Sequence, residues 1–211
     1  MKKPLFITGI GTDVGKTIVS AILVEALHAD YWKPVQSGDL DNSDTMKVQR
    51  LVANTQTVFH PEAYRLTQPF SPHKSAALDG VEINLEKIVA PQTNNQLIIE
   101  GAGGLMVPLN DRHFIIDMIK KLDAEVVLVS RNYLGSINHT LLSIALLRQY
   151  YIPIKAIVFN GDTDPYSEQA IHHYAGETVN IYRVGLLKEL TSSEISKQAV
   201  VLQDQIKHNP L

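Results

Sequence analysis

The 211 residues, 45% hydrophobic and 19% charged, suffice for one globular domain with a two-sided α/β core, which we expect to span residues 1–211. A net charge of −3 without a Lys/Arg-rich run argues against nucleic acid as a partner, and the absence of cysteine excludes disulfides, thiolate nucleophiles and cysteine-ligated metals. The apolar run before Gly9 is too short for a signal peptide or a membrane span, so we expect a cytoplasmic protein without a membrane partner.

The first predicted elements are a strand, a phosphate-binding loop and a helix. Leu5 to Thr8 are apolar or β-favouring, the glycine-rich loop runs from Gly9 to Thr17, and Ile18 to Leu27 has helical periodicity. Glycines allow backbone N–H groups to surround phosphate oxygens, while Lys16 can reach the β- and γ-phosphates and Thr17 can hold Mg²⁺. Five residues, instead of the usual four, separate the first glycine from Gly-Lys-Thr. A glycine-rich turn in an ordinary βα unit is the alternative.

A short second strand within Tyr31 to Gly38 ends at a proline, and Lys33 stands at its end. Because ligands gather at the carboxyl ends of parallel strands, Lys33 would face the same rim as the phosphate loop. A solvated lysine before a turn is the alternative. Next, Met46 to Val52 has helical spacing, and Ser43 or Asp44 could cap that helix. Asp44 could instead give a carboxylate to a metal, or do neither.

The middle of the chain is interrupted by prolines, although Asn84 to Val89 is predicted to be helical. Leu97 to Glu100 then gives a buried-strand pattern that ends in an acid and a glycine-rich turn, Gly101 to Gly104. Glu100 occupies the position of an acidic strand end near Mg²⁺ in phosphate-loop nucleotidases, with a structural acid at a tight turn as the alternative. The glycines favour close backbone approach to a ligand.

The last third alternates strands and helices. Strands are predicted at Glu125 to Ser130, Ile154 to Phe159 and Ile181 to Val184, and helices from Leu134 through Leu147 and from Ser193 to Ile206. Ser136 is a candidate N-cap, while a free helix N-terminus there would bind a substrate carboxylate. The eight histidines lack metal-ligand spacing. This alternation predicts a doubly wound, mostly parallel sheet with helices on both faces.

Several separated motifs together resemble one family. They follow in order: Thr8-Gly9 with Thr12 and Val14 to Thr17; Lys33-Pro34-Val35 with Ser37-Gly38; Asn42 to Asp44; Ser71 to His73; Glu100 to Gly104; Leu134-Gly135; and Ile137 to His139. In this combination the chain is similar to the dethiobiotin synthetases, which are ATP-dependent ligases. A phosphate loop alone indicates only a nucleotide, whereas Lys-Pro-Val-x-Ser-Gly with Glu-Gly-Ala-Gly-Gly is far more specific.

The resemblance implies a P-loop NTPase fold and a Mg²⁺-dependent reaction. Diaminopelargonic acid, CO2 and ATP would give dethiobiotin, ADP and phosphate, through a carbamate and a carbamic-phosphoric anhydride. Carried over by motif, Lys33, Lys16 and Thr12 act at the reacting groups. The metal would be held by Thr17, Asp44 and Glu100, and the substrate by Ser37, Gly135, Ser136 and Asn138. The nucleotide contacts would be Asp13, Val14, Gly15, Lys16, Thr17, Ile18, Asp44, Glu100, Gly101, Ala102, Gly103, Asn160, Gly161, Lys188, Glu189 and Leu190.

The resemblance also implies a homodimer whose active site lies near the subunit interface. Lys188 departs from a frequent proline of the family, and Gly11 and Asp13 stand where some relatives carry an acid and a glutamate. A nucleotide-dependent positioning or partition switch is the main rival, but its signature lysine is replaced by Gly11. A related amidoligase would need a cysteine nucleophile, which this chain lacks.

Overall fold

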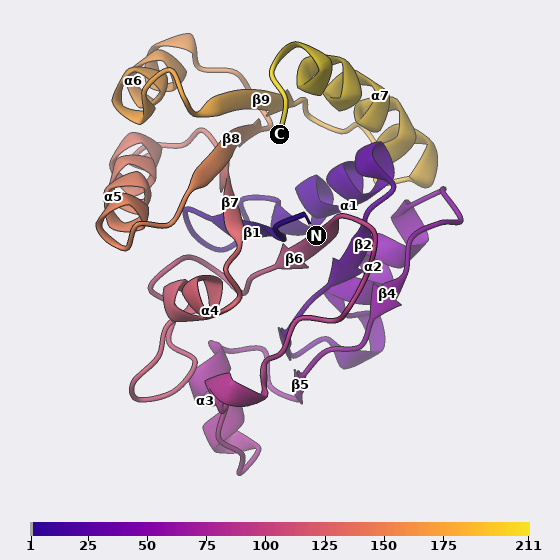
Figure 1. The fold of residues 1–211 in the computed structure, drawn as a ribbon, viewed down its shortest axis with the longest axis vertical. Helices are drawn as coiled ribbons and strands as arrows, with labels where there is room; N and C mark the ends of the chain where they lie inside the picture. The colour runs from indigo at the N-terminus through magenta and orange to yellow at the C-terminus, as the bar shows by residue number, and fades with distance from the viewer. Residues whose placement is uncertain (1) are drawn as a thin grey trace.

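A computed structural model describes residues 2–211, so Met1 of the expected domain lies outside the described residues. Its main sheet has seven strands in the order β4-β2-β6-β1-β7-β8-β9, and all neighbouring strands are parallel (Figure 1). The strands are β1 (Leu5–Gly9), β2 (Asp30–Trp32), β4 (Phe59–His60), β6 (Leu97–Glu100), β7 (Glu125–Ser130), β8 (Ile154–Asn160) and β9 (Asn180–Val184). A second sheet pairs β3 (Val35–Ser37) with β5 (Tyr64–Leu66).

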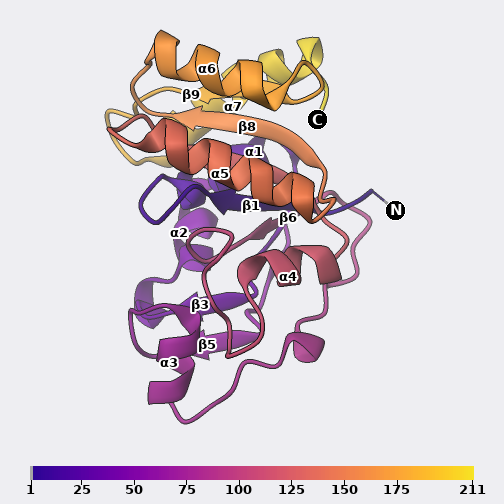
Figure 2. The same cartoon turned by 90° about the vertical axis from the view of Figure 1, so that its left-hand side faces the viewer.

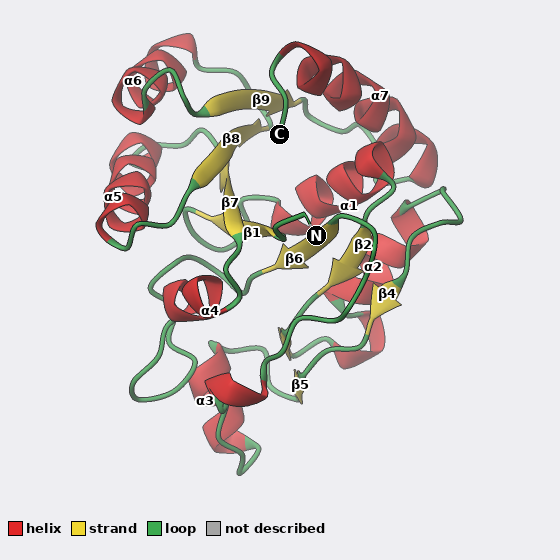
Figure 3. Ribbon diagram, viewed as in Figure 1, coloured by secondary structure: helices red, strands yellow, loops and turns green. Residues whose placement is uncertain are grey.

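Helices cover both faces of the main sheet, as Figures 2 and 3 show. The helices are α1 (Lys16–Leu27), α2 (Asp44–Leu51), α3 (Pro72–Leu78), α4 (Ile115–Lys121), α5 (Ser136–Gln149), α6 (Pro165–Ala175) and α7 (Ser192–His208), with short 3-10 turns η1 (Leu40–Asn42) and η2 (Leu85–Lys87); α3 packs on the small sheet instead of the main one. Successive strand residues point to opposite faces, so Phe6 packs in the core under α4, α5 and α6, whereas Leu5 and Ile7 pack under α1 and α7. The predicted doubly wound fold is confirmed.

The predicted short strand that ends at a proline is confirmed as β2, which stops because Pro34 has no N–H to continue its ladder. The chain then forms β3 in the second sheet, which was not predicted. Two other predictions are wrong. From Asn84 to Val89 only the single turn η2 is helical: the proline at position 91 disfavours helical backbone at residue 90, so a helix here cannot extend past residue 89, and so short a helix is marginal. Ser136 is not the N-cap of α5: Gly135 takes that position with φ 103°, and Ser136 is the buried first residue.

Six strands and helices were not predicted: β3, β4, β5, α3, α4 and α6. Strands of two or three residues are too short to show an alternating pattern, and α3 and α6 begin with prolines that resemble loop signals. The order of the main sheet places β2, β6 and β1 side by side. Their carboxyl ends therefore bring Lys33, Glu100 and the phosphate loop to one rim, as expected for a parallel sheet.

Candidate active site

The phosphate loop is held by close backbone contacts that only glycine permits. Gly15 has φ 93°, and a Cβ at that position would lie 2.0 Å from Nδ2 of Asn160. The same Nδ2 donates to the carbonyl of Val14 at 2.9 Å, so the end of β8 supports the loop. A Cβ at Gly9 would meet Val14 Cγ2 at 2.6 Å. Gly9 and Gly15 are thus required by close approach of neighbouring side chains, whereas a Cβ at Gly11 would meet nothing within 4 Å.

Lys16 and the start of α1 present positive charge to this loop. The Lys16 ammonium is mostly buried and donates to the carbonyl of Gly11 at 2.9 Å. Burial lowers the pKa of Lys16, although the negative charge of Glu100 acts in the opposite direction. Gly15 is the N-cap of α1 and has no side chain to bond the free N–H groups of the first turn. These groups are suited to bind an anion.

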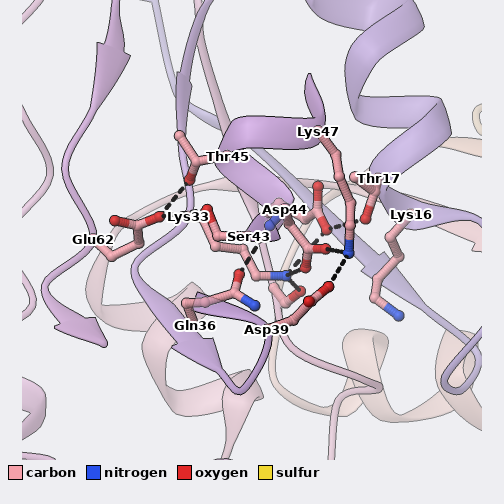
Figure 4. Close-up of polar contacts among 12 residues, drawn as sticks. Lys16, Thr17, Lys33, Gln36, Asp39, Ser43, Asp44, Thr45, Lys47 and Glu62 are labelled. Carbon is pink, nitrogen blue, oxygen red and sulfur yellow. Dashed lines mark hydrogen bonds and ion pairs between the residues drawn. The ribbon is translucent and has the colours of Figure 1, made fainter. Parts of the chain in front are cut away.

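Beside the loop, Lys33 connects the two predicted acidic groups, Asp44 and Glu100, and Figure 4 shows its contact with Asp44. Its Nζ donates to Asp44 Oδ2 at 2.7 Å, to Glu100 Oε1 at 3.1 Å and to the Gly101 carbonyl at 3.1 Å. Glu100 Oε1 also accepts from Thr17 Oγ1 at 2.9 Å. The side chain of Lys33 is only 5% exposed and that of Glu100 is fully buried. One cluster therefore unites the lysine, both carboxylates and the hydroxyl that were predicted separately.

The charges of this cluster reinforce one another. Burial alone would lower the pKa of Lys33, but the negative charges of Glu100 and Asp44 outweigh it and raise that pKa. For Asp44, burial acts against ionisation, while the positive charges of Lys33 and Lys47 prevail and lower its pKa. Lys33 is therefore held as a cation and Asp44 as an anion.

The oxygen donors of the cluster suit a hard divalent cation such as Mg²⁺. They are one hydroxyl, from Thr17, and two carboxylates, from Asp44 and Glu100. Within residues 2–211, His, Cys, Asp and Glu side chains form no group of three that could hold a metal by themselves. The donor set thus fits a cation that also uses water or phosphate oxygens, as Mg²⁺ usually does.

A cleft of about 680 Å³ lies over the cluster and contains most of the predicted site residues. Ser37 lines it, and Ser37 Oγ is buried without a hydrogen-bond partner among the described residues. An unpaired buried hydroxyl is costly unless a ligand completes it. Other predicted residues in the lining are Thr12, Asp13, Gly15, Lys16, Thr17, Ile18, Lys33, Asp44, Glu100, Ala102, Gly103 and Leu190.

The remaining predicted residues lie outside this lining. Val14 and Gly101 contribute carbonyls that accept from Asn160 and Lys33. Asn160 and Gly161 close β8 beside the loop, and the Gly161 N–H donates to the carbonyl of residue 184 in β9. The other predicted contacts are exposed or lie elsewhere: Lys188 and Glu189 after β9, and Gly135, Ser136 and Asn138 at the start of α5.

Several polar residues at the site were not predicted, among them Tyr31, Lys47 and Gln36, which accepts from the Asp44 N–H at 3.2 Å. Tyr31 Oη donates to Glu100 Oε2 at 2.9 Å, and burial, followed by the charge of Glu100, raises the pKa of Tyr31. Lys47 lines the cleft one helical turn after Asp44. The spacing of three residues was the available signal for Lys47. No signal in the sequence pointed to Tyr31, because an aromatic residue in a buried strand usually belongs to the hydrophobic core.

None of the helices formed by residues 2–211 has the length and apolar character needed to span a bilayer.

Solved structures with similar folds are nucleotide-binding proteins. A cell division ATPase MinD from Pyrococcus furiosus aligns with TM-score 0.61 at 14% identity, covering 98% of this chain and 99% of that one. A ParA family ATPase from Chlorobium tepidum aligns with TM-score 0.54 at 15% identity, covering 99% and 94%. At such identities the likeness shows only the fold, which is that of the P-loop NTPases.

Sequence relatives are much closer. The model of a family described as AAA domain matches residues 3–194. An ATP-dependent dethiobiotin synthetase of Christiangramia forsetii is 57% identical over 171 residues, which are 81% of this chain and 82% of the relative. Another, from Cytophaga hutchinsonii, is 50% identical over 203 residues, covering 96% and 98%. The chain therefore belongs to the family of ATP-dependent dethiobiotin synthetases, as its motifs indicated.

Proposed function

We propose that this chain is a ligase that converts diaminopelargonic acid, CO2 and ATP into dethiobiotin, ADP and phosphate. The observation that carries the proposal is the cluster of Lys33, Asp44 and Glu100 between the phosphate loop and the unpaired hydroxyl of Ser37. Such a cleft can hold a triphosphate and a small substrate side by side. Family membership supplies the reaction, and the cluster supplies the groups that the reaction needs.

The main task of the site is to bring anions together. A carbamate and a triphosphate repel each other, so phosphoryl transfer requires cations fixed where negative charge develops. We assign Lys16 to the β- and γ-phosphates and Lys33 to the carbamate and the transferring phosphoryl group. Mg²⁺, when bound by Thr17, Asp44 and Glu100, would neutralise phosphate charge. Lys33 already lies within 3.1 Å of both carboxylates, so it is positioned beside that site.

The substrate would lie on the side of the cleft formed by Ser37, Thr12 and the glycine turn after Glu100. Ser37 Oγ would hydrogen-bond a substrate amine or carbamate, and Thr12 would lie close to the reacting groups. The second amine then attacks the anhydride carbon and releases phosphate, closing the cyclic urea. Enclosure of this step limits hydrolysis of the anhydride by water.

The nucleotide would extend from Gly15 toward the end of β8. We assign the residues from Asp13 through Ile18 to the phosphates, and those from Gly101 through Gly103 to the same region. Asn160 and Gly161 would lie on the adenine side. Leu190 lines the cleft, which supports a base contact there. Lys188 and Glu189 complete that segment in the proposal, although the chain departs from the family at Lys188.

We further propose a homodimer in which the start of α5 reaches the neighbouring cleft. Gly135, Ser136 and Asn138 lie outside the cleft of their own chain. Around them Leu134 is fully exposed, and Ile137 and Leu142 are also exposed, as is common for residues that a partner covers. Asn138 would then bind the substrate carboxylate of the neighbouring site. The expected cytoplasmic location stays a prediction.

One experiment tests the reaction directly. The purified chain is incubated with ATP, Mg²⁺, bicarbonate and diaminopelargonic acid, and the cyclic urea is sought by mass spectrometry. We expect product and ADP in equal amounts, and neither product nor rapid ATP consumption without the diamine. Rapid ATP hydrolysis that does not depend on the diamine would instead support a nucleotide-dependent positioning or partition switch.

A further inference from the structure

Lys47 is a third lysine of the cleft, and its partners differ from those of Lys16 and Lys33. Its Nζ lies 2.7 Å from Asp39 Oδ2 and 3.6 Å from Asp44 Oδ1 (Figure 4). Lys33 holds the other oxygen of Asp44, Oδ2. The Asp44 carboxylate thus has one lysine on each of its oxygens, and Lys47 is the one on the more open side of the site.

The mobility available to the two lysines is unequal. The Lys33 side chain is 5% exposed and makes three hydrogen bonds, so it is fixed. The side chains of Lys47 and Asp39 are 32% and 54% exposed. An ion pair this exposed contributes only about 0–1 kcal/mol, so a strongly charged ligand can compete for the lysine.

We propose that Lys47 is an exchangeable phosphate-binding cation. When a nucleoside triphosphate binds, Lys47 breaks its ion pair with Asp39 and binds the terminal phosphoryl group instead. The inference rests on the proposed function, because that function places a triphosphate beside Asp44. Lys47, Lys16 and Thr17 line the same cleft, so a flexible lysine side chain reaches the space next to the proposed metal site. Asp39 acts as the internal competitor that holds Lys47 aside.

This role predicts opposite effects for the two members of one ion pair. If the pair only fixed the loop before α2, removal of either charge would have the same consequence. If Lys47 exchanges, Lys47→Ala weakens triphosphate binding, whereas Asp39→Asn strengthens it by removing the competitor. Asp39 has φ 53°, and asparagine tolerates such a backbone, so Asp39→Asn preserves the loop.

The test is calorimetric titration of Mg²⁺ complexes of a non-hydrolysable ATP analogue and of ADP. We expect Lys47→Ala to weaken binding of the analogue about 5- to 10-fold, Lys47→Arg to retain most affinity, and Asp39→Asn to tighten binding about 2- to 5-fold. ADP should change less than about 2-fold, since it lacks the terminal phosphoryl group. Lys197→Ala is the matched control. Lys197 pairs with Glu194 on α7 at the i,i+3 spacing that Lys47 has with Asp44, but it lies outside the cleft lining.

The possible failures are distinct. Equal weakening by Lys47→Ala and Asp39→Asn, or equal loss for ADP and the analogue, would overturn the role of Lys47 and leave the proposed function intact. Lack of any nucleotide binding by the unaltered chain would overturn both. Circular dichroism and thermal unfolding of each variant verify that the fold is retained.

Discussion

At the residue scale, Lys33 pairs with Glu100 and Asp44 and, in the proposed function, also acts on the reacting groups, so one substitution tests both roles. Lys33→Met keeps most of the length of the side chain but removes the ion-pair partner of the buried Glu100 carboxylate and leaves Asp44 with Lys47 alone. We expect turnover to fall about 10²- to 10³-fold, as for other preorganised donors, and unfolding free energy to fall by about 3–5 kcal/mol. Steady-state assays and urea unfolding measure the two effects. Turnover close to that of the unaltered chain would remove Lys33 from catalysis.

Gly15 offers a second prediction at this scale, with an internal control. Gly15→Ala introduces both strain at φ 93° and a Cβ 2.0 Å from Asn160 Nδ2. Gly80 has φ 68°, but a Cβ added there would meet nothing within 4 Å, so Gly80→Ala brings strain alone. We expect Gly80→Ala to cost about 1–3 kcal/mol of stability with normal nucleotide affinity. Gly15→Ala should cost more and weaken nucleotide binding at least about 10-fold, and equal behaviour of the two variants would contradict the steric argument.

Sequence reasoning predicted the residues whose chemistry is fixed by a local motif. Lys16, Thr17 and Glu100 each stand where a strand meets a glycine loop, so a parallel sheet alone brings them together. Tyr31 and Lys47 were missed because their contacts are with side chains on other segments: Tyr31 with Glu100 of β6, and Lys47 with Asp39 in the loop before α2. Strand and helix periodicity carry no information of that kind.

At the element scale, β2 is anchored at its first residue by a buried carboxylate. Asp30 Oδ1 accepts from the Val58 N–H at 2.9 Å and from Asn95 Nδ2 at 3.0 Å, and Oδ2 accepts from Thr93 Oγ1 at 2.5 Å. Burial opposes ionisation, but these hydrogen bonds prevail and lower the pKa of Asp30. The carboxylate thus ties β2 to the segments that lead into β4 and β6.

Because the pKa of Asp30 is lower in the folded chain, its contribution to stability has a defined pH dependence. It is fully present above the unfolded pKa of about 3.9 and is lost as pH falls through the lower folded pKa. Asp30→Asn should therefore lower unfolding free energy by about 1–3 kcal/mol near pH 7, with a smaller difference near pH 3. Urea unfolding at both pH values tests this, with Asp111→Asn in an exposed loop as control. A difference that grows in acid would contradict the sign.

Elements of the fold could be predicted where they are long and regular. The five longer buried strands and helices α1, α5 and α7 follow from apolar periodicity, whereas the two strands of the small sheet do not. Those short strands are fixed by long-range contacts: the Pro34 carbonyl accepts the N–H groups of Ala63 and Tyr64, far along the chain. Tertiary pairing of this kind is invisible in a local window of sequence.

At the scale of the whole molecule, the start of α5 lies outside the cleft of its own chain, so a role for it in substrate binding would require a second chain. Asn138 is exposed and does not line the cleft of its own chain. If it serves the neighbouring site, Asn138→Asp places a negative charge against the substrate carboxylate. We expect the diamine KM to rise at least about 10-fold with nucleotide affinity unchanged, because only one of the two ligands meets that charge.

Mixing two defective chains separates a shared site from a self-contained one. A Lys33→Met chain lacks the lysine of its own cleft, whereas an Asn138→Asp chain places a negative charge in the cleft of its neighbour. In a mixed dimer, one cleft receives both defects and the other receives neither. Because a two-fold dimer has equivalent interfaces, random exchange of equal amounts should restore about a quarter of normal activity. Activity no greater than the sum of the separate variants, with exchange verified by differential labelling, would show that each chain holds a complete site.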